Sequence, residues 1–399
     1  MVSPTGYNVT SYGEMITCEP RMSAYADALR KAITPGCSVI DIGAGSGIFS
    51  LLACQYGAGS VVAIEPDVSV EVLKISAATN GFADRIAVFQ GISTDYVGPQ
   101  ADVIISDIRG CLPLFEHHIP TIVDARHRLL APGGRMIPAR DRLHGALVHD
   151  PEFYRPNIEP WLHNAFGLDL SDGHRFAANQ WRKASLTPID LMSAPQEVLQ
   201  LDYATITDPN ISIDFNLTPE APGEAHGFLV WFDAELAPGI GFSNAPGEPE
   251  QVYGQTFFPF ERPIFLAAGD RIAVKLRANL VEGAYVWSWT SKLWRADAAS
   301  PKLTYRQSTF LSQILSPAKL ALRSSGFVPP ATPAMATDRH CLSLFDGEKS
   351  QGDIAHAMAA SFPGRFSGEA DALTYVVNLA GRYRDGDIYP KATSEDDAQ

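Results

Sequence analysis

The sequence predicts an α/β fold, in which a Rossmann-like parallel sheet is followed by an antiparallel β-barrel domain and a small helical C-terminal module. Strands and helices alternate from residue 38 to about residue 140, which is typical of a parallel sheet. Beyond residue 140, apolar residues recur at every second position between turns rich in proline and glycine, which favours antiparallel β structure. Helical apolar spacing returns beyond residue 338.

The first domain is expected over residues 1–140. Short apolar runs typical of buried strands occur at residues 39–42, 61–64, 86–89 and 103–105. A helix is expected near residues 115–130. The proline and glycines of Ala131–Gly134 are expected to end it, and a strand is expected to restart at Arg135.

The turn after the first strand is the most informative segment. The strand leads into Gly43, Gly45 and Gly47, and Ile48 opens an apolar helical stretch. A dinucleotide-binding loop would carry its third glycine where Ile48 stands. The spacing instead resembles the S-adenosylmethionine (SAM) loop of class I methyltransferases.

The second strand ends in an acid that supports a nucleoside site. Glu65 follows the apolar run 61–64 directly. A carboxylate at the end of this strand can accept hydrogen bonds from both ribose hydroxyls of a nucleoside. We therefore expect SAM as the cofactor and S-adenosyl-L-homocysteine as the product, with no metal.

Bulk composition excludes several classes of protein. The 399 residues carry a formal charge of −14, which argues against nucleic-acid binding. The five cysteines are scattered and lack the paired spacing of zinc sites or disulfide frameworks. A signal peptide and an apolar run long enough to span a membrane are both absent from the sequence, so a cytoplasmic protein is expected.

The remaining segments are expected to form a second domain, a linker and a third module. Residues 141–325 form the β-barrel domain, and the proline-rich residues 326–338 form the linker. Residues 339–385 form the helical module, in which Ser350 and Asp353 make a capping box. Residues 386–399 are an acidic tail.

Local matches over about residues 7–325 resemble the protein arginine methyltransferases, of which the chain looks like a divergent bacterial-type member. The segment from Tyr12 through Met15 to Arg21 is similar to the family's N-terminal helix that folds over SAM. In that family the arginine pairs with the methionine carboxylate of SAM, an interaction well suited to a guanidinium. The β domain matches at residues 231–233, 243–249 and 265–270.

The resemblance, together with the glycine loop, implies a set of cofactor-binding residues. These are Met15, Arg21, Asp41, Gly43, Ala44, Gly45, Gly47, Ile48, Glu65, Pro66, Gly91, Ile92, Ser93 and Asp107. The segment 91–93 follows the third strand, where the family contacts adenine.

Residues 106–116 resemble the family's acidic hairpin loop, which holds the methyl acceptor. Asp107 stands where the family has its first glutamate, and Glu116 holds the second position. Two carboxylates can bracket a guanidinium and aim a nitrogen lone pair at the methyl group. We therefore expect Asp107, Glu116 and Tyr12 to be catalytic.

The resemblance also has departures that bear on the acceptor. Arg109 replaces an apolar residue, and Gln251–Tyr253 replaces the family's Thr-His-Trp motif. Tyr7, Arg109 and Tyr253 are the expected acceptor-contacting residues. The resemblance implies N-methylation of a guanidino nitrogen, in a peptide or protein or in free arginine. Two alternatives stay open: N- or O-methylation of another small molecule or biosynthetic peptide, with Arg109 gripping an acid, and a non-catalytic SAM-binding scaffold.

Two further segments imply partners. Residues 161–182 fall where the family carries its dimerisation arm, so a homodimer is expected. Residues 340–383 resemble the PqqD-like peptide-binding modules of modified-peptide biosynthesis, which implies leader-peptide binding; a generic helical appendage is the alternative.

Overall fold

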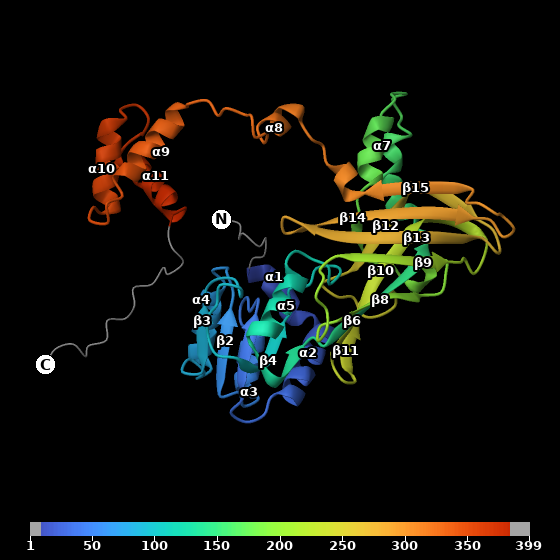
Figure 1. Cartoon of the computed structure of the whole chain (residues 1–399), viewed down its shortest axis with the longest axis horizontal. Helices are drawn as coiled ribbons and strands as arrows, with labels where there is room; N and C mark the ends of the chain where they lie inside the picture. The colour runs from blue at the N-terminus through green and yellow to red at the C-terminus, as the bar shows by residue number, and fades with distance from the viewer. Residues whose placement is uncertain (1–8, 384–399) are drawn as a thin grey trace. The chain divides into compact units, whose positions relative to one another are not determined.

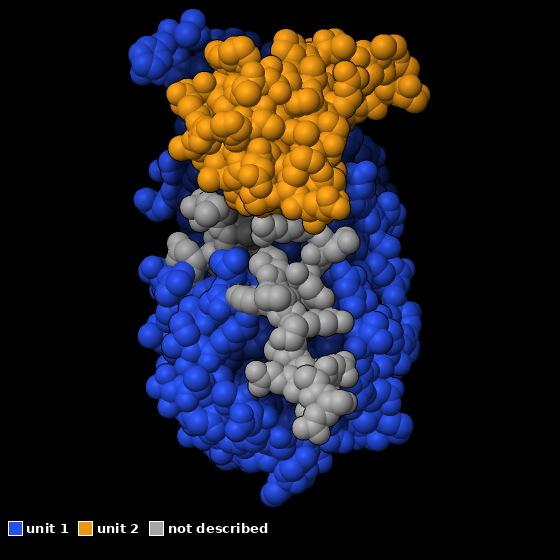
Figure 2. All heavy atoms as spheres, turned by 90° about the vertical axis from the view of Figure 1, so that its left-hand side faces the viewer, with its two compact units in different colours: residues 1–314 blue, residues 315–399 orange. Residues whose placement is uncertain are grey.

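The computed structural model describes residues 9–383, and the chain divides into two compact units. Residues 1–314 form the first unit and residues 315–399 the second (Figures 1 and 2). Tyr7 and the acidic segment 386–399 lie outside the described residues. Within residues 9–383, no helix has the length and apolar character needed to cross a membrane.

The first unit begins with a five-stranded parallel sheet in the order β3-β2-β1-β4-β5. Its strands are β1 (Ser38–Ile42), β2 (Ser60–Ile64), β3 (Ile86–Phe89), β4 (Ala101–Ser106) and β5 (Leu130–Ile137). Its helices are α1 (Val9–Thr17), α2 (Glu19–Ala32), α3 (Ile48–Gln55), α4 (Val70–Thr79) and α5 (His118–Arg128) (Figure 1). The strand order reverses between β1 and β4, and sheets of this kind bind ligands at the carboxyl ends of those strands.

The central strands of this sheet are apolar on both faces. Val39, Ile40, Ile104 and Ile105 are all buried, as expected of strands that helices cover on both sides. The helix predicted near residues 115–130 is confirmed as α5.

The predicted restart of the next strand at Arg135 is wrong. β5 begins at Leu130, which pairs with Ala101, and the pairing shifts register before Val103 and Arg135 meet. Gly133 has a φ of +78° within this irregular stretch. A β-bulge with a left-handed glycine lets the strand continue through residues that otherwise favour a turn.

The rest of the first unit is two antiparallel sheets. The six-stranded sheet has the order β7-β12-β10-β6-β8 with β11 paired to β10, and the four-stranded sheet has the order β15-β14-β13-β9. Their strands are β6 (Arg140–Val148), β7 (Arg182–Ala184), β8 (Gln196–Asp202), β9 (Ile211–Leu217), β10 (Gly223–Ala237), β11 (Ile240–Ser243), β12 (Gln255–Leu266), β13 (Arg271–Val281), β14 (Ala284–Trp294) and β15 (Leu303–Ser308). The predicted antiparallel domain is confirmed in this form.

A helical excursion interrupts the six-stranded sheet between β6 and β7, and α7 projects beyond the strands (Figure 1). The excursion and the short turns elsewhere in the unit are α6 (Pro151–Asn157), η1 (Glu159–Trp161), α7 (Ser171–Ala178), η2 (Pro188–Asp190) and η3 (Thr309–Ser312). Residues 161–182 thus fold as a mixture of helix and loop between the two strands.

The second unit is helical, with a small core of its own. Its helices are α8 (Pro317–Ala321), α9 (Pro333–Ser343), α10 (Gln351–Ser361) and α11 (Glu369–Gly381). The core consists of Cys341, Ile354, Ala355, Met358, Ala372, Val376 and Leu379. The predicted capping box at Ser350 and Asp353 is confirmed. Helix α9 begins within the segment that the sequence predicted as a linker.

Candidate active site

The glycine loop between β1 and α3 is shaped by backbone conformations that favour glycine. Gly43 has a φ of +75° and Gly45 a φ of +54°. A Cβ atom on Gly43 would lie 2.4 Å from Ile108 Cγ2, and one on Gly45 would lie 2.5 Å from Tyr12 Cε1. Both positions therefore require the absence of a side chain as well as the left-handed conformation.

Glu65 is tied to this loop by the backbone. Its Oε2 accepts a hydrogen bond from Gly45 N at 2.9 Å, and its Oε1 accepts one from Asp67 N at 2.9 Å. Glu65 is 5% exposed, and burial raises its pKa. The carboxylate is thus fixed in place at the end of β2.

Asp41 lies at the base of the same loop. Its Oδ2 accepts a hydrogen bond from Ser50 Oγ at 2.7 Å, while its buried Oδ1 has no hydrogen-bond partner among the described residues. Burial raises the pKa of Asp41 to about 7. An unpaired buried carboxylate oxygen calls for a donor from a ligand or from solvent. Together with the glycine loop, this oxygen fits a bound nucleoside cofactor.

Helices α1 and α2 bring further predicted residues to the loop. Tyr12 reaches Ser69, whose Oγ donates to the Tyr12 hydroxyl at 3.3 Å. Arg21 is 5% exposed, and its Nη1 donates to the carbonyl oxygen of Met15 at 3.1 Å. The N-terminal helices therefore lie over the glycine loop, as expected of a cover for the cofactor.

Segment 91–93 lies beside Glu65. Gly91 N donates to the Glu65 carbonyl oxygen at 3.2 Å. Ser93 is buried, whereas Ile92 is 53% exposed. Pro66 is exposed as well. An exposed apolar side chain next to a nucleoside site suits contact with a base, so the predicted adenine contact stays a prediction with a fitting position.

Asp107, in the loop after β4, is enclosed by donors. Arg21 donates to its Oδ2 through Nε and lies 2.6 Å from the same oxygen through Nη2. Arg109 Nε donates to Oδ1 at 3.2 Å. The Tyr253 hydroxyl lies 2.8 Å from Oδ1 and 2.6 Å from Oδ2. The Asp107 side chain is 4% exposed.

Two opposing effects act on the pKa of Asp107. Burial alone would raise it, but the charges of Arg21 and Arg109 outweigh burial and hold the pKa at about 2. Asp107 is therefore a carboxylate under ordinary conditions, and it is already paired with two guanidinium groups.

Arg109 is buried more deeply than expected of a residue that binds a substrate. Its side chain is 0% exposed, and Nη1 donates to Asp141 Oδ1 at 2.7 Å. Nη2 donates to the Tyr25 hydroxyl at 2.6 Å. Its guanidinium also faces four aromatic rings, those of Tyr25, Phe232, Phe242 and Tyr253. The predicted contact between Arg109 and the acceptor is not what this geometry favours.

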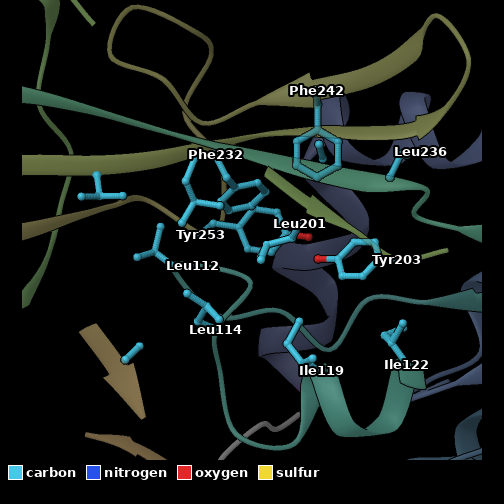
Figure 3. Close-up of a cluster of buried hydrophobic side chains, with 14 of the residues drawn as sticks. Leu112, Leu114, Ile119, Ile122, Leu201, Tyr203, Phe232, Leu236, Phe242 and Tyr253 are labelled. Carbon is cyan, nitrogen blue, oxygen red and sulfur yellow. The ribbon is translucent and has the colours of Figure 1, made fainter. Parts of the chain in front are cut away.

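The buried network continues from Arg109 to α5. Asp141 accepts a short hydrogen bond from the Tyr203 hydroxyl, and His118 Nε2 lies 3.0 Å from that hydroxyl. Because the Tyr203 proton points at Asp141, His118 donates through Nε2. Burial, with a smaller contribution from Arg109, lowers the pKa of His118 to about 3. Figure 3 shows Tyr203 together with Phe232, Phe242 and Tyr253 in a cluster of buried hydrophobic side chains.

Glu116 contrasts with Asp107, because it is exposed and stands at a φ of +41°. Among residues 9–383 it makes no hydrogen bond or ion pair. The two predicted catalytic carboxylates are thus in different states: one is buried and paired, and the other is open to solvent. The left-handed backbone at a glutamate is strained, a feature that persists where the surrounding fold imposes it.

Sequence reasoning missed Tyr25, His118, Asp141 and Tyr203. The sequence holds one weak signal for Asp141, because this acid stands at a position of β6 that faces the core. Within the described part of the chain, no group of three or more His, Cys, Asp or Glu side chains is arranged to hold a metal ion.

Comparison with known proteins gives two family matches. Residues 139–282 match the family model of the arginine methyltransferase oligomerization subdomain, and residues 23–139 match that of ribosomal protein L11 methyltransferase. An arginine N(omega)-methyltransferase of Streptomyces achromogenes subsp. streptozoticus is 31% identical over 271 residues, which cover 66% of this chain and 74% of that protein. A probable protein arginine N-methyltransferase 6 of Arabidopsis thaliana is 30% identical over 243 residues, covering 58% and 55% of the two chains.

Solved structures share the fold of about three quarters of this chain. The Trypanosoma brucei PRMT1 enzyme–prozyme heterotetrameric complex with AdoHcy has a TM-score of 0.69 at 23% identity, and the match covers 74% of this chain and 97% of that one. Arabidopsis thaliana protein arginine methyltransferase 10 has a TM-score of 0.65 at 21% identity, with 75% and 97% covered.

Proposed function

The chain belongs to the arginine N-methyltransferase family, and on that premise we propose that it transfers the methyl group of SAM to a guanidino nitrogen of arginine. The acceptor is an arginine in a peptide or protein, or free arginine. One observation carries the proposal. The glycine loop follows β1, and the loop that holds Asp107 and Glu116 follows β4. These two strands are paired, and the order of the sheet reverses between them.

The cofactor supplies an electrophilic methyl group on a positively charged sulfur. Glu65 would accept hydrogen bonds from the ribose hydroxyls, and the glycine loop would let the backbone approach the nucleoside. Arg21 would pair with the methionine carboxylate, because a guanidinium binds a carboxylate through two parallel hydrogen bonds. Tyr12 would cover the site.

The acceptor would be held by Glu116. An exposed carboxylate without an ion pair can accept two hydrogen bonds from a guanidinium and fix the direction of the attacking nitrogen. Asp107 would act from behind the loop, as the counter-ion that keeps Arg21 in position. The chain thereby aligns the reactants, which is the main task in a direct methyl transfer.

The proposal is tested with the full chain, methyl-labelled SAM, free arginine and an arginine-containing peptide. Mass spectrometry should find the methyl group on a guanidino nitrogen, and a peptide with lysine in place of arginine is the control. Methyl transfer to another small molecule alone, or SAM binding without any transfer, would contradict the proposal in favour of the two alternative functions.

We also propose a homodimer assembled through the excursion at residues 161–182. Its exposed apolar side chains are Trp161, Phe166, Leu168 and Leu170. Such a cluster on a protruding segment marks an interaction surface. Light scattering should give a dimer for the wild type and a monomer for Phe166→Ser/Leu168→Ser. A monomeric wild type with full activity would contradict the dimer.

The second unit is proposed to bind a leader peptide, independently of SAM. It has its own buried core, and none of the residues proposed for SAM lies in it. Removing residues 330–399 should leave SAM affinity unchanged and reduce the rate on peptides at low concentration, because tethering raises the effective concentration of a bound peptide. Equal loss on peptides and free arginine would contradict this role.

We also propose that the protein acts in the cytoplasm, where free cysteines such as its five are kept reduced. Imaging of a fluorescent fusion would test this location.

A further inference from the structure

Asp107 has little capacity left for an acceptor. A carboxylate offers about four lone-pair positions to donors. Arg21 reaches Asp107 through two nitrogens, and Arg109 and Tyr253 each supply one more donor. A guanidinium that approached Asp107 would have to displace one of these buried groups.

The charges around Asp107 are also balanced. Arg21 and Arg109 carry two positive charges, and Asp107 and Asp141 carry two negative ones, all at ion-pair distance. An acceptor guanidinium would bring a fifth charge into a neutral cluster. Glu116, in contrast, has no ion pair among residues 9–383, so its charge is free to attract a cation.

Arg109 holds this arrangement from the far side. Its guanidinium carbon lies 5.3 Å from the ring centroids of both Phe232 and Phe242, distances at which a cation is attracted to an aromatic face. Its partner Asp141 lies on β6, the first strand of the antiparallel domain. Aromatic rings and a buried acid thus keep the Arg109 side chain from rotating away from Asp107.

We propose that Arg109 is a positioning residue that sets acceptor recognition: by occupying Asp107 Oδ1 it withdraws Asp107 from the acceptor and assigns the acceptor guanidinium to Glu116. The inference rests on the proposed function and deepens it. Glu116 alone then binds the acceptor guanidinium, a role that the sequence analysis assigned to Asp107 and Glu116 together. Without Arg109, the Tyr253 hydroxyl is the one donor left on Asp107 Oδ1 among residues 9–383, so this oxygen should become open to the acceptor while Oδ2 stays paired with Arg21.

The test is a double-mutant cycle between Glu116 and the Arg109–Asp141 pair. Arg109→Met/Asp141→Asn removes both charges together, because removing one would leave its partner buried and unpaired. Glu116→Gln is then made in the wild type and in this background. Acceptor affinity is measured by calorimetry with S-adenosylhomocysteine bound, and kcat/KM is measured with arginine.

The loss caused by Glu116→Gln should be at least about tenfold smaller in the Arg109→Met/Asp141→Asn background, since interacting sites are not additive. An equal loss in both backgrounds, within about twofold, would overturn the inference. Arg142→Met is the matched control: it removes an ion pair with Glu235 from the same strand, and the loss from Glu116→Gln should be unchanged.

Tyr253→Phe keeps the inference testable should the Arg109 variant fail to fold. It removes one donor from Asp107 and retains the ring that stacks on Phe242. The loss from Glu116→Gln should shrink here too, and an unchanged loss would count against the inference. A wild type that transfers no methyl group to arginine would overturn the proposed function, and this inference with it. An active wild type with equal losses would overturn the inference alone.

Discussion

The loop after β1 and the loop after β4 lie at neighbouring strand ends, yet they are built in opposite ways. The loop after β1 is shaped mainly by its backbone: its glycines adopt left-handed conformations, and the Gly45 amide donates a hydrogen bond to Glu65. In the second, side chains from distant segments converge on Asp107, including Tyr253, which is 146 positions away. A site formed by backbone conformation depends on a few adjacent residues, whereas a side-chain network depends on the whole fold.

The largest expected effect concerns the second loop. Glu116→Gln should reduce kcat by about 100-fold or more, because misplacing the attacking nitrogen by about 1 Å has a cost of that order. SAM affinity should stay unchanged, since Glu116 makes no hydrogen bond or ion pair with a proposed SAM residue among residues 9–383. Steady-state kinetics with calorimetry would check both. A wild-type rate in the variant would remove Glu116 from the acceptor site.

The next effect concerns the first loop. Glu65→Ala should weaken SAM binding by about 1.5–3 kcal/mol, the range for hydrogen bonds to a charged group, which corresponds to roughly 10- to 150-fold. Calorimetry with SAM measures the loss directly. If affinity is retained, the assignment of the ribose to Glu65 fails.

A matched pair of glycines tests whether the backbone carries the first loop. Gly45→Ala and Gly36→Ala both place a side chain at positive φ, which costs about 1–2 kcal/mol of stability in each case. A Cβ at Gly36 would meet no atom within 4 Å, whereas one at Gly45 would meet Tyr12. We expect only Gly45→Ala to weaken SAM binding. Equal SAM affinities in the two variants would contradict the proposed crowding.

The smallest effect is a pH dependence from the buried network. The pKa of His118 is about 3 in the folded chain, below the ordinary value of 6.5, so the unfolded chain binds a proton first as pH falls. The free energy of unfolding should therefore fall as pH drops from 6.5 toward 3, and His118→Gln should show a shallower fall. Denaturant unfolding at several pH values would check this, with the exposed neighbour His117→Gln as control. Parallel curves for wild type and His118→Gln would contradict it.

The same difference explains what the sequence could predict. The alternation of strands and helices, helix α5 and the positions of the glycine loop and Glu65 follow from local pattern, because each depends on residues close in the chain. The early start of β5 was missed, since the bulge at Gly133 depends on pairing with β4.

The loop after β4, which we propose to hold the acceptor, was only half predictable. The sequence analysis predicted Asp107 and Glu116 as a pair of acids, but their contrasting environments were not predictable, because partners of Asp107 come from α2 and from the turn before β12. The burial of Arg109 ran against the usual exposure of arginine. Its acid partner Asp141 belongs to the next domain, and no local pattern links the two.

A crystal structure with S-adenosylhomocysteine and arginine bound tests the central claim most directly. The account predicts that the arginine guanidinium donates to the Glu116 carboxylate at ordinary hydrogen-bond distances of about 2.7–2.9 Å, while Asp107 keeps its contacts with Arg109 and Tyr253. A guanidinium bracketed by Asp107 and Glu116 together, with Arg109 displaced, would contradict it.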